Sequence, residues 1–130
     1  MNAPSVDIKD MLIGADMGLT FGINLFISRE PAKPDSCVTI YDTPGMAEGL
    51  TLNRDERYEY PSIQIRVRDK SYTDGWARAD QIRRLLHGRA NETWNEAYYT
   101  IIKVSSGPAM MGYDDNQRVL IVINFLIQRR

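Results

Sequence analysis

The sequence contains few of the residues from which most catalytic and metal sites are built. Its 130 residues include one histidine, His87, and one cysteine, Cys37. A histidine–cysteine zinc site needs several such ligands, and a cysteine nucleophile needs a base beside it, so neither is supported. No serine lies in a G-x-S-x-G elbow, and no glycine-rich loop carries the Lys-Ser/Thr pair of a phosphate site. We therefore expect no enzyme, no metal and no cofactor.

Net charge and long apolar runs are also missing. Sixteen basic side chains against seventeen acidic ones leave a net charge of −1, which does not predict tight binding to nucleic acid or to a membrane. A single cysteine excludes an intramolecular disulfide and fits a reducing cytoplasm. No stretch is long enough to span a bilayer, and no basic segment followed by an apolar run opens the chain. These absences predict one soluble domain over residues 1–130, without a classical export signal.

A strand that runs directly into a helix is the clearest pattern in the chain. Apolar and polar side chains alternate strictly over residues 61–68, which predicts a half-buried strand. Ser71 and Asp74 fit a capping box, so a helix should begin near Tyr72, and Gly88 suits its C-terminal end. The stripe expected on the buried side of this helix comprises Tyr72, Trp76, Ala79, Ile82 or Arg83, Leu85 and Leu86.

The N-terminal part predicts a short helix and two strands. Ser5 or Asp7 is placed to cap the helix, and Asp7 is expected on its solvent side. Alternating apolar residues predict a strand over 19–27, and β-branched and aromatic residues predict another over 37–41. The connection between them suits a wide hairpin, which implies antiparallel pairing.

The middle of the chain predicts a long exposed loop over residues 43–58. This segment is charged and poor in apolar residues beyond its Pro-Gly turn. Loops of this length are usually functional or disordered, and we slightly favour the functional interpretation.

The C-terminal part predicts a polar connector, a strand over 98–104, a Ser-Ser-Gly-Pro turn and a hairpin. The hairpin turns at residues 114–116 and returns as a strand over 119–127. That last strand is apolar at almost every position, which predicts burial on both faces, either in the centre of a sheet or under a neighbouring subunit.

Two groups of charged residues are candidates for a binding surface. Gln64, Arg66 and Arg68 share the polar face of one strand, where two guanidinium groups would suit carboxylates across a subunit boundary. The arginines of the following helix are more simply explained as a solvated face. Asp114 and Asp115 could hold a cation, but adjacent carboxylates at this position are most often turn formers.

Three stretches together resemble one protein family. They are Asn-Leu-Phe-Ile-Ser-Arg-Glu-Pro at 24–31, Asp-Ser-Cys-Val-Thr-Ile-Tyr-Asp-Thr-Pro-Gly at 35–45, and Tyr-Pro-Ser-Ile-Gln-Ile-Arg-Val-Arg at 60–68. This order resembles the tail terminators, which are minor capsid proteins of long-tailed bacteriophages. The resemblance implies an α+β fold, with a mostly antiparallel sheet and two main helices packed on one face.

The resemblance also implies a function and partners. A tail terminator is a virion protein at the head–tail junction that forms a ring of about six subunits, which suits closed heterologous contacts. The ring caps the tail tube, stops its polymerisation and meets the head connector, and it would assemble in the host cytoplasm. DNA would pass through it without tight binding. The alternative is a neck or head-completion protein bound to the portal or connector.

Within this resemblance the candidate residues take specific places. Gln64, Arg66 and Arg68 are expected to face a neighbouring subunit or the lumen. The charged run Arg54, Asp55, Glu56 and Arg57 is expected to contact the tube or the connector. The pair Asp114 and Asp115 is the alternative lumen candidate, because acidic side chains repel DNA.

Overall fold

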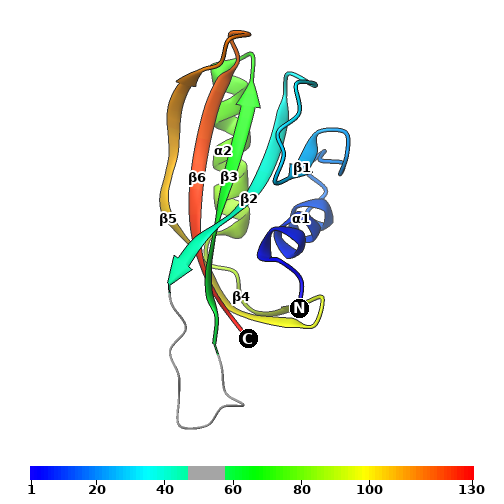
Figure 1. Cartoon of the computed structure of the whole chain (residues 1–130), viewed down its shortest axis with the longest axis vertical. Helices are drawn as coiled ribbons and strands as arrows, with labels where there is room; N and C mark the ends of the chain where they lie inside the picture. The colour runs from blue at the N-terminus through cyan, green and yellow to red at the C-terminus, as the bar shows by residue number, and fades with distance from the viewer. Residues whose placement is uncertain (47–57) are drawn as a thin grey trace.

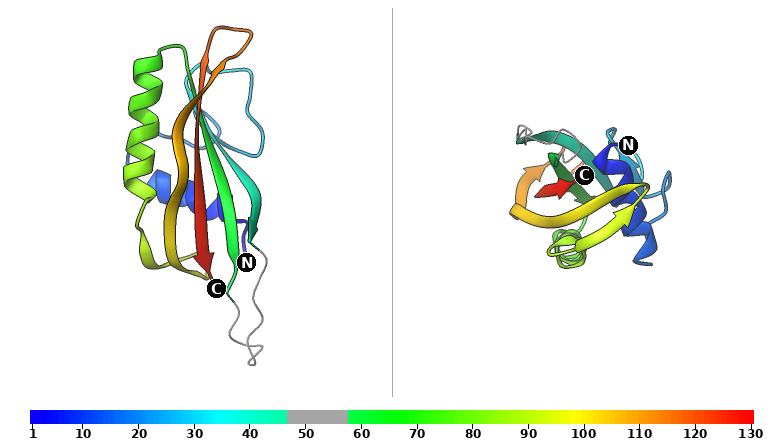
Figure 2. Two further views of the ribbon diagram at one scale, coloured as in Figure 1. Left: turned by 90° about the vertical axis from the view of Figure 1, so that its left-hand side faces the viewer. Right: turned by 90° about the horizontal axis from the view of Figure 1, so that it is seen from below.

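The computed structural model describes residues 1–46 and 58–130, which form two layers. A six-stranded sheet has the strand order β1-β2-β3-β6-β5-β4, and two helices cover one of its faces (Figures 1 and 2). Neighbouring strands are antiparallel except β1 and β2. The predicted α+β fold is confirmed. The elements are α1 (Pro4–Gly14), β1 (Leu25–Ile27), β2 (Cys37–Met46), β3 (Tyr60–Asp69), α2 (Tyr72–Leu86), β4 (Ala90–Trp94), β5 (Ala97–Tyr113) and β6 (Val119–Arg129).

The core lies between the two helices and the sheet, with the central strands β3 and β6 beneath α2. Ile63, Ile65 and Val67 are buried on the helix face, as the alternation predicts, and they pair with buried residues of β6. The central place of the last strand is therefore confirmed. Only its helix-facing side is fully buried, since Leu120 and Leu126 on the other side remain half-exposed.

Helix α2 packs on the sheet through smaller residues than the sequence predicts. Gly75 lies so close to β6 that a Cβ there would sit 3.3 Å from Ile121 Cδ1. Tyr72 and Trp76 instead lie on the flank of the helix, 46% and 37% exposed, and stack on each other. The buried stripe is Gly75, Ala79, Ile82 and Leu86.

The predicted cap of α2 is half of a capping box. Ser71 Oγ accepts a hydrogen bond from the backbone N–H of Asp74 (3.3 Å), as expected. In a complete capping box the Asp74 carboxylate would accept from the backbone N–H of Ser71. Here Asp69 takes that place, and its Oδ1 accepts from Ser71 N–H (2.9 Å). Gly88 follows the helix with φ +87°, the left-handed conformation that was predicted.

The predicted cap of α1 is wrong. The helix begins at Pro4, and both Ser5 and Asp7 lie inside it with fully buried side chains. The cap comes from across the fold: Asp42 of β2 accepts hydrogen bonds from Ser5 N–H (3.0 Å) and Ser5 Oγ–H (2.6 Å). A contact between residues this far apart in the chain has no local sequence signal.

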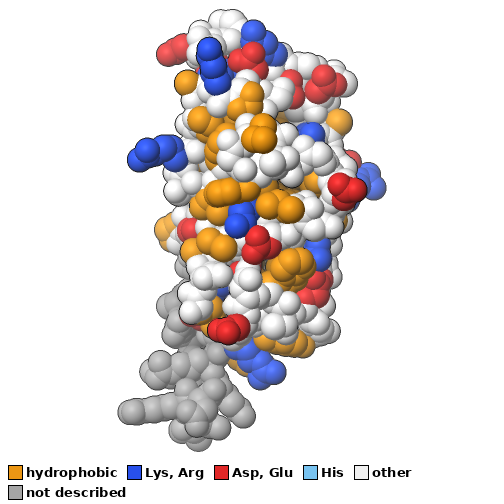
Figure 3. Space-filling model, turned by 90° about the vertical axis from the view of Figure 1, so that its right-hand side faces the viewer, with side chains coloured by type: hydrophobic (Ala, Val, Ile, Leu, Met, Phe, Trp, Pro, Cys, Tyr) orange, Lys and Arg blue, Asp and Glu red, His pale blue; other side chains and the backbone are white. Residues whose placement is uncertain are grey.

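The predicted strand over 19–27 and its antiparallel pairing are also wrong. Only β1 is extended, and it runs parallel to β2. The residues before β1 form a turn in which Gly22 has φ +87° and Asn24 Oδ1 accepts from Thr20 N–H (2.7 Å). This turn leaves Phe21 and Ile23 exposed on the side of the molecule that carries α1 and β1, where Figure 3 shows apolar side chains gathered across the middle.

Two segments of the C-terminal part that the sequence predicts as irregular, the polar connector and the Ser-Ser-Gly-Pro turn, belong to strands in the structure. Residues 90–94 form β4, and the Ser-Ser-Gly-Pro segment lies inside β5, where shifts in pairing register mark bulges. Gly107 makes one bulge with φ +91°, and a Cβ there would lie 2.5 Å from Val122 O. The turn at 114–116 and the hairpin onto β6 are confirmed.

The segment predicted as a loop over 43–58 begins later than expected, because β2 continues through Met46. Its charged run, Arg54 to Arg57, lies outside the described residues. Among the residues that are described, no helix is long and apolar enough to cross a membrane.

Candidate assembly surface

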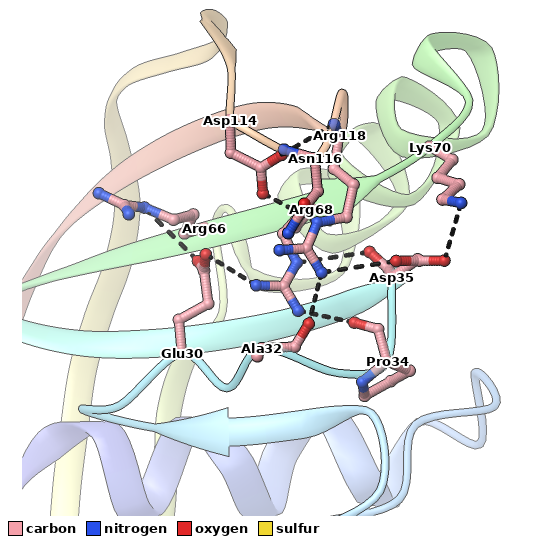
Figure 4. Close-up of polar contacts among 10 residues, drawn as sticks. All are labelled: Glu30, Ala32, Pro34, Asp35, Arg66, Arg68, Lys70, Asp114, Asn116 and Arg118. Atoms are coloured by element: carbon pink, nitrogen blue, oxygen red, sulfur yellow. Dashed lines mark hydrogen bonds and ion pairs between the residues drawn. The ribbon is translucent and has the colours of Figure 1, made fainter.

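The sheet face without helices, called the open face here, carries the predicted polar residues. Since Ile63, Ile65 and Val67 point toward the helices, the alternating side chains of Gln64 and Arg66 point the other way. Residues 28–36 lie over one part of the open face and are bound to it by a cluster of arginines and carboxylates (Figure 4). Neither helix lies over the rest of the open face.

Arg68 is the buried centre of this cluster. Its side chain is 3% exposed, and Nη1 donates to Glu30 Oε1 (3.2 Å) while Nη2 donates to Pro34 O (2.6 Å). Arg68 was predicted to meet a neighbour or the lumen with Gln64 and Arg66. The structure places it beneath its own chain instead, where it holds residues 30–35 on the sheet.

Arg118 attaches the same segment to the β5–β6 turn. Its Nη1 donates to Ala32 O (2.5 Å), and its Nε donates to Asp114 Oδ2 (2.8 Å). Asp114 also accepts the backbone N–H groups of Arg118 and Asn116, each at 2.9 Å. Of the two predicted lumen carboxylates, Asp114 therefore closes its own turn, whereas Asp115 is exposed.

The Asp114 contacts predict a contribution to stability that is lost in acid. Hydrogen bonds from the backbone N–H and the guanidinium of Arg118 hold the pKa of Asp114 below its usual value of 3.8. A lowered pKa in the folded state stabilises the protein above pH 3.8, and this stabilisation disappears as pH falls through the folded-state pKa. Urea unfolding from pH 7 to pH 2 should show the loss. The Asp114→Asn variant should have a flatter profile, and an equally steep one would contradict the assignment.

Arg66 is held in a different way from Arg68. Its guanidinium lies 5.6 Å from the centroid of the Tyr41 ring, and its Nε is 3.8 Å from Glu30 Oε2. No hydrogen-bond partner for Nε is found among residues 1–46 and 58–130. The side chain is 36% exposed. Arg66 is therefore oriented by its neighbours while part of its guanidinium faces solvent, an arrangement suited to a carboxylate from another chain.

A polar row crosses the open face beside Arg66. Gln64 Nε2 donates to Asn124 Oδ1 (3.1 Å), and Asn124 Nδ2 donates to Ser106 Oγ (2.9 Å). These bonds connect β3, β6 and β5 side by side. Gln64, Asn124 and Ser106 thus form a continuous polar band across the open face.

An apolar groove, called the sheet groove here, lies where the open face approaches the end of β2. Its volume is about 200 Å³. Leu126 of β6 and Ile101 of β5 form its base, and Lys103 is an exposed charged residue at its edge. The residues that line it are Met46, Tyr60, Ile101, Lys103, Leu126, Ile127 and Gln128.

Sequence reasoning missed the partners that distinguish the two arginines. Glu30 and Asp35 lie in a proline-containing segment that shows no periodicity, so only the folded chain reveals that they pair with β3 and β6. A set of three or more His, Cys, Asp or Glu side chains arranged to hold a metal ion is absent from the part of the chain that the structure describes.

Comparisons with known proteins find both a family and a fold. A family model described as "Bacteriophage tail terminator protein" matches residues 6–130. A chain from the structure titled "Virion of native gene transfer agent (GTA) particle" shares the fold, with a TM-score of 0.69 and 13% sequence identity. The likeness covers 98% of this chain and 94% of that one. No curated protein sequence matches.

Proposed function

Because the chain belongs to the bacteriophage tail terminator family, we propose that it assembles as a ring on the end of the tail tube, stops the growth of the tube and joins it to the head connector. The family match over residues 6–130 is the observation that carries this proposal. It makes the protein a structural component of the virion tail, and the finer steps of capping and joining are what we infer from it.

The open face supports assembly with other subunits. Half-exposed apolar side chains of β6 and an outward-facing guanidinium on β3 occupy one surface that neither α1 nor α2 covers. In a closed ring each subunit buries two different surfaces against its neighbours. We place Gln64 and Arg66 at such a boundary or at the lumen, and Arg68 behind them as a support.

The two remaining sets of candidates are assigned to other contacts. Arg54, Asp55, Glu56 and Arg57 are proposed to contact the tube or the connector. Asp115, exposed on the turn at the far end of the β5–β6 hairpin, is the proposed lumen carboxylate. A ring of about six copies, each nearly neutral, would let DNA pass without tight binding.

The proposal is tested with purified tube protein. The mass of the protein across a concentration series should show a ring-sized species, either alone or once tube protein is added. Tubes grown in its presence should stop at shorter lengths in electron micrographs. A stable monomer that leaves tube length unchanged would overturn the proposal, and binding to the connector alone would identify a neck or head-completion protein instead.

Charge reversal at Arg66 tests the boundary. Arg66→Glu should lower assembly at least about tenfold, because a buried like-charge contact replaces a paired one. The matched control is Arg84→Glu, which makes the same charge reversal at a position of α2 that is 72% exposed. Thermal melting should show that both variants fold. Normal assembly of a folded Arg66→Glu protein would remove Arg66 from the boundary.

A further inference from the structure

The turn between α1 and β1 presents a rigid apolar projection, called the α1 edge patch here. It consists of Ile13, Phe21 and Ile23, and the last two are 50% and 65% exposed. Thr20 O accepts the backbone N–H groups of Ile23, Asn24 and Leu25, so the turn is fixed by its own hydrogen bonds. Large side chains that are exposed on a rigid turn are typical of a protein-binding site.

The sheet groove matches a side chain of the α1 edge patch in size. The groove holds about 200 Å³, more than the roughly 150 Å³ that accommodates a benzene ring inside a protein. Phe21 supplies an aromatic ring of this size, and Ile23 lies two residues away on the same turn. The sheet groove is therefore large enough to take the half-exposed ring of Phe21.

The charges beside the two surfaces are also complementary. Lys103 at the sheet groove and Arg66 further along the open face are basic. In the sequence Asp10 precedes Ile13 by three positions and Asp16 follows it by three, and Asp16 is exposed. Lys9 also lies beside Phe21, with Nζ 4.8 Å from the ring centroid, and it pairs with Asp10 at 3.2 Å, so these two charges offset each other and Asp16 supplies the net negative charge. Opposite charges beside matching apolar surfaces favour one register of contact.

We propose that the partner of the sheet groove is a second copy of this chain, which inserts Phe21 and Ile23 of its α1 edge patch. The two surfaces belong to different elements, so the contact is heterologous, and repeating it from copy to copy closes a ring or grows without end. This inference rests on the ring proposed above and identifies its subunit contact. Asp16 of one copy pairs with Lys103 of the next.

The test uses one variant for each surface. Phe21→Glu puts a charge on the projection, and Ile101→Glu puts one in the groove. Each should raise the concentration needed for assembly at least about tenfold, as expected when a central contact is lost. An equal mixture should form dimers and nothing larger, because each variant keeps one working surface. Sedimentation velocity measures all three samples.

Further variants guard against misfolding and against effects of added charge. Lys103→Glu tests the groove at an exposed position if Ile101→Glu fails to fold, and Asp16→Lys in the same chain should restore assembly. The matched control is Met111→Glu, since Met111 is an exposed apolar residue of β5 away from both surfaces. It should assemble like the unmodified chain.

The outcomes separate this inference from the ring itself. If the unmodified chain never assembles, with or without tube protein, the proposed function fails. If it assembles and the folded Phe21→Glu and groove variants assemble equally well, the ring stands and the contact proposed here is wrong. Dimers of Phe21→Glu alone would also overturn the inference, because they would require a contact that does not use the projection.

Discussion

Replacement of Asp7 by alanine should lower the free energy of unfolding by about 3–5 kcal/mol, the range found when one partner of a buried ion pair is removed. Asp7 is fully buried, and its Oδ2 lies 3.3 Å from Nη1 of the buried Arg129. The Tyr99 hydroxyl donates to the same carboxylate, and Asn95 Nδ2 donates to its other oxygen at 2.8 Å. Alanine at position 7 would leave these donors without their shared acceptor.

The protonation of Tyr99 is consistent with this arrangement. Burial and the hydrogen bond to Asp7 raise the pKa of Tyr99 above its usual value. The phenol therefore stays neutral and remains a donor throughout the pH range of an unfolding experiment. Arg129 also donates to the Tyr99 oxygen (3.1 Å) and to Glu59 Oε2 (2.9 Å). The buried cluster around Asp7 therefore connects α1 to the ends of β3, β5 and β6.

The control for Asp7 is a second aspartate on the same helix. Asp10 also accepts from Asn95 Nδ2 (2.8 Å), but its side chain is one-third exposed. Asp10→Ala should cost no more than about 0.5 kcal/mol, as for surface substitutions. Urea unfolding of both variants gives the comparison. If Asp7→Ala lost as little unfolding free energy as Asp10→Ala, the buried contacts of Asp7 would contribute little to stability. A double-mutant cycle of Asp7→Ala with Tyr99→Phe would measure the coupling between these two side chains.

The burial of Asp7 shows where the sequence stops being informative. Its position beside lysine and another aspartate predicts a solvated helix face, since a charged residue is seldom buried without a partner. The partners come from β5 and β6, 92 and 122 positions further along the chain. No local pattern can report contacts over such distances.

The elements that the sequence predicts well are those with strong periodicity. The sequence predicts β3 and α2 because their apolar residues recur at intervals of two and of about 3.6, and it predicts β6 because an almost unbroken apolar run has the length of a strand. β1 was predicted too long, because the alternation through Phe21 and Ile23 reflects a turn with exposed apolar residues. The bulged part of β5 was predicted as a turn, because a Gly-Pro pair marks both structures.

The same reasoning applies to the candidate site. A period of two correctly places Gln64, Arg66 and Arg68 on one face of a strand. It cannot tell which of them the chain itself will cover. Residues 28–36 fold over Arg68 and leave part of Arg66 exposed, so two arginines with the same local pattern have different roles.

Replacement of Arg68 by methionine should lower the free energy of unfolding by about 3–5 kcal/mol. Methionine keeps much of the apolar stem but removes every donor to Glu30 and to the Pro34 carbonyl. Glu30 would then remain largely buried, and among the described residues Arg66, at 3.8 Å, would be the one basic side chain left within 4 Å of its carboxylate. Arg66→Met is the control, and because its guanidinium is partly solvated it should cost about 1 kcal/mol or less.

A second substitution separates the ion pair from general packing. In the Arg68→Met chain, Glu30→Gln should recover about 1–3 kcal/mol, because a neutral amide is cheaper to bury than an unpaired carboxylate. In the unmodified chain the same Glu30→Gln change should be destabilising, so the sign of its effect depends on Arg68. Hydrogen exchange at β1 should accelerate in Arg68→Met and slow again in the double variant, since residues 28–36 connect β1 to β2 across this contact. If Glu30→Gln has the same effect in both backgrounds, Arg68 holds residues 28–36 by packing, and its charge is not what keeps them on the open face.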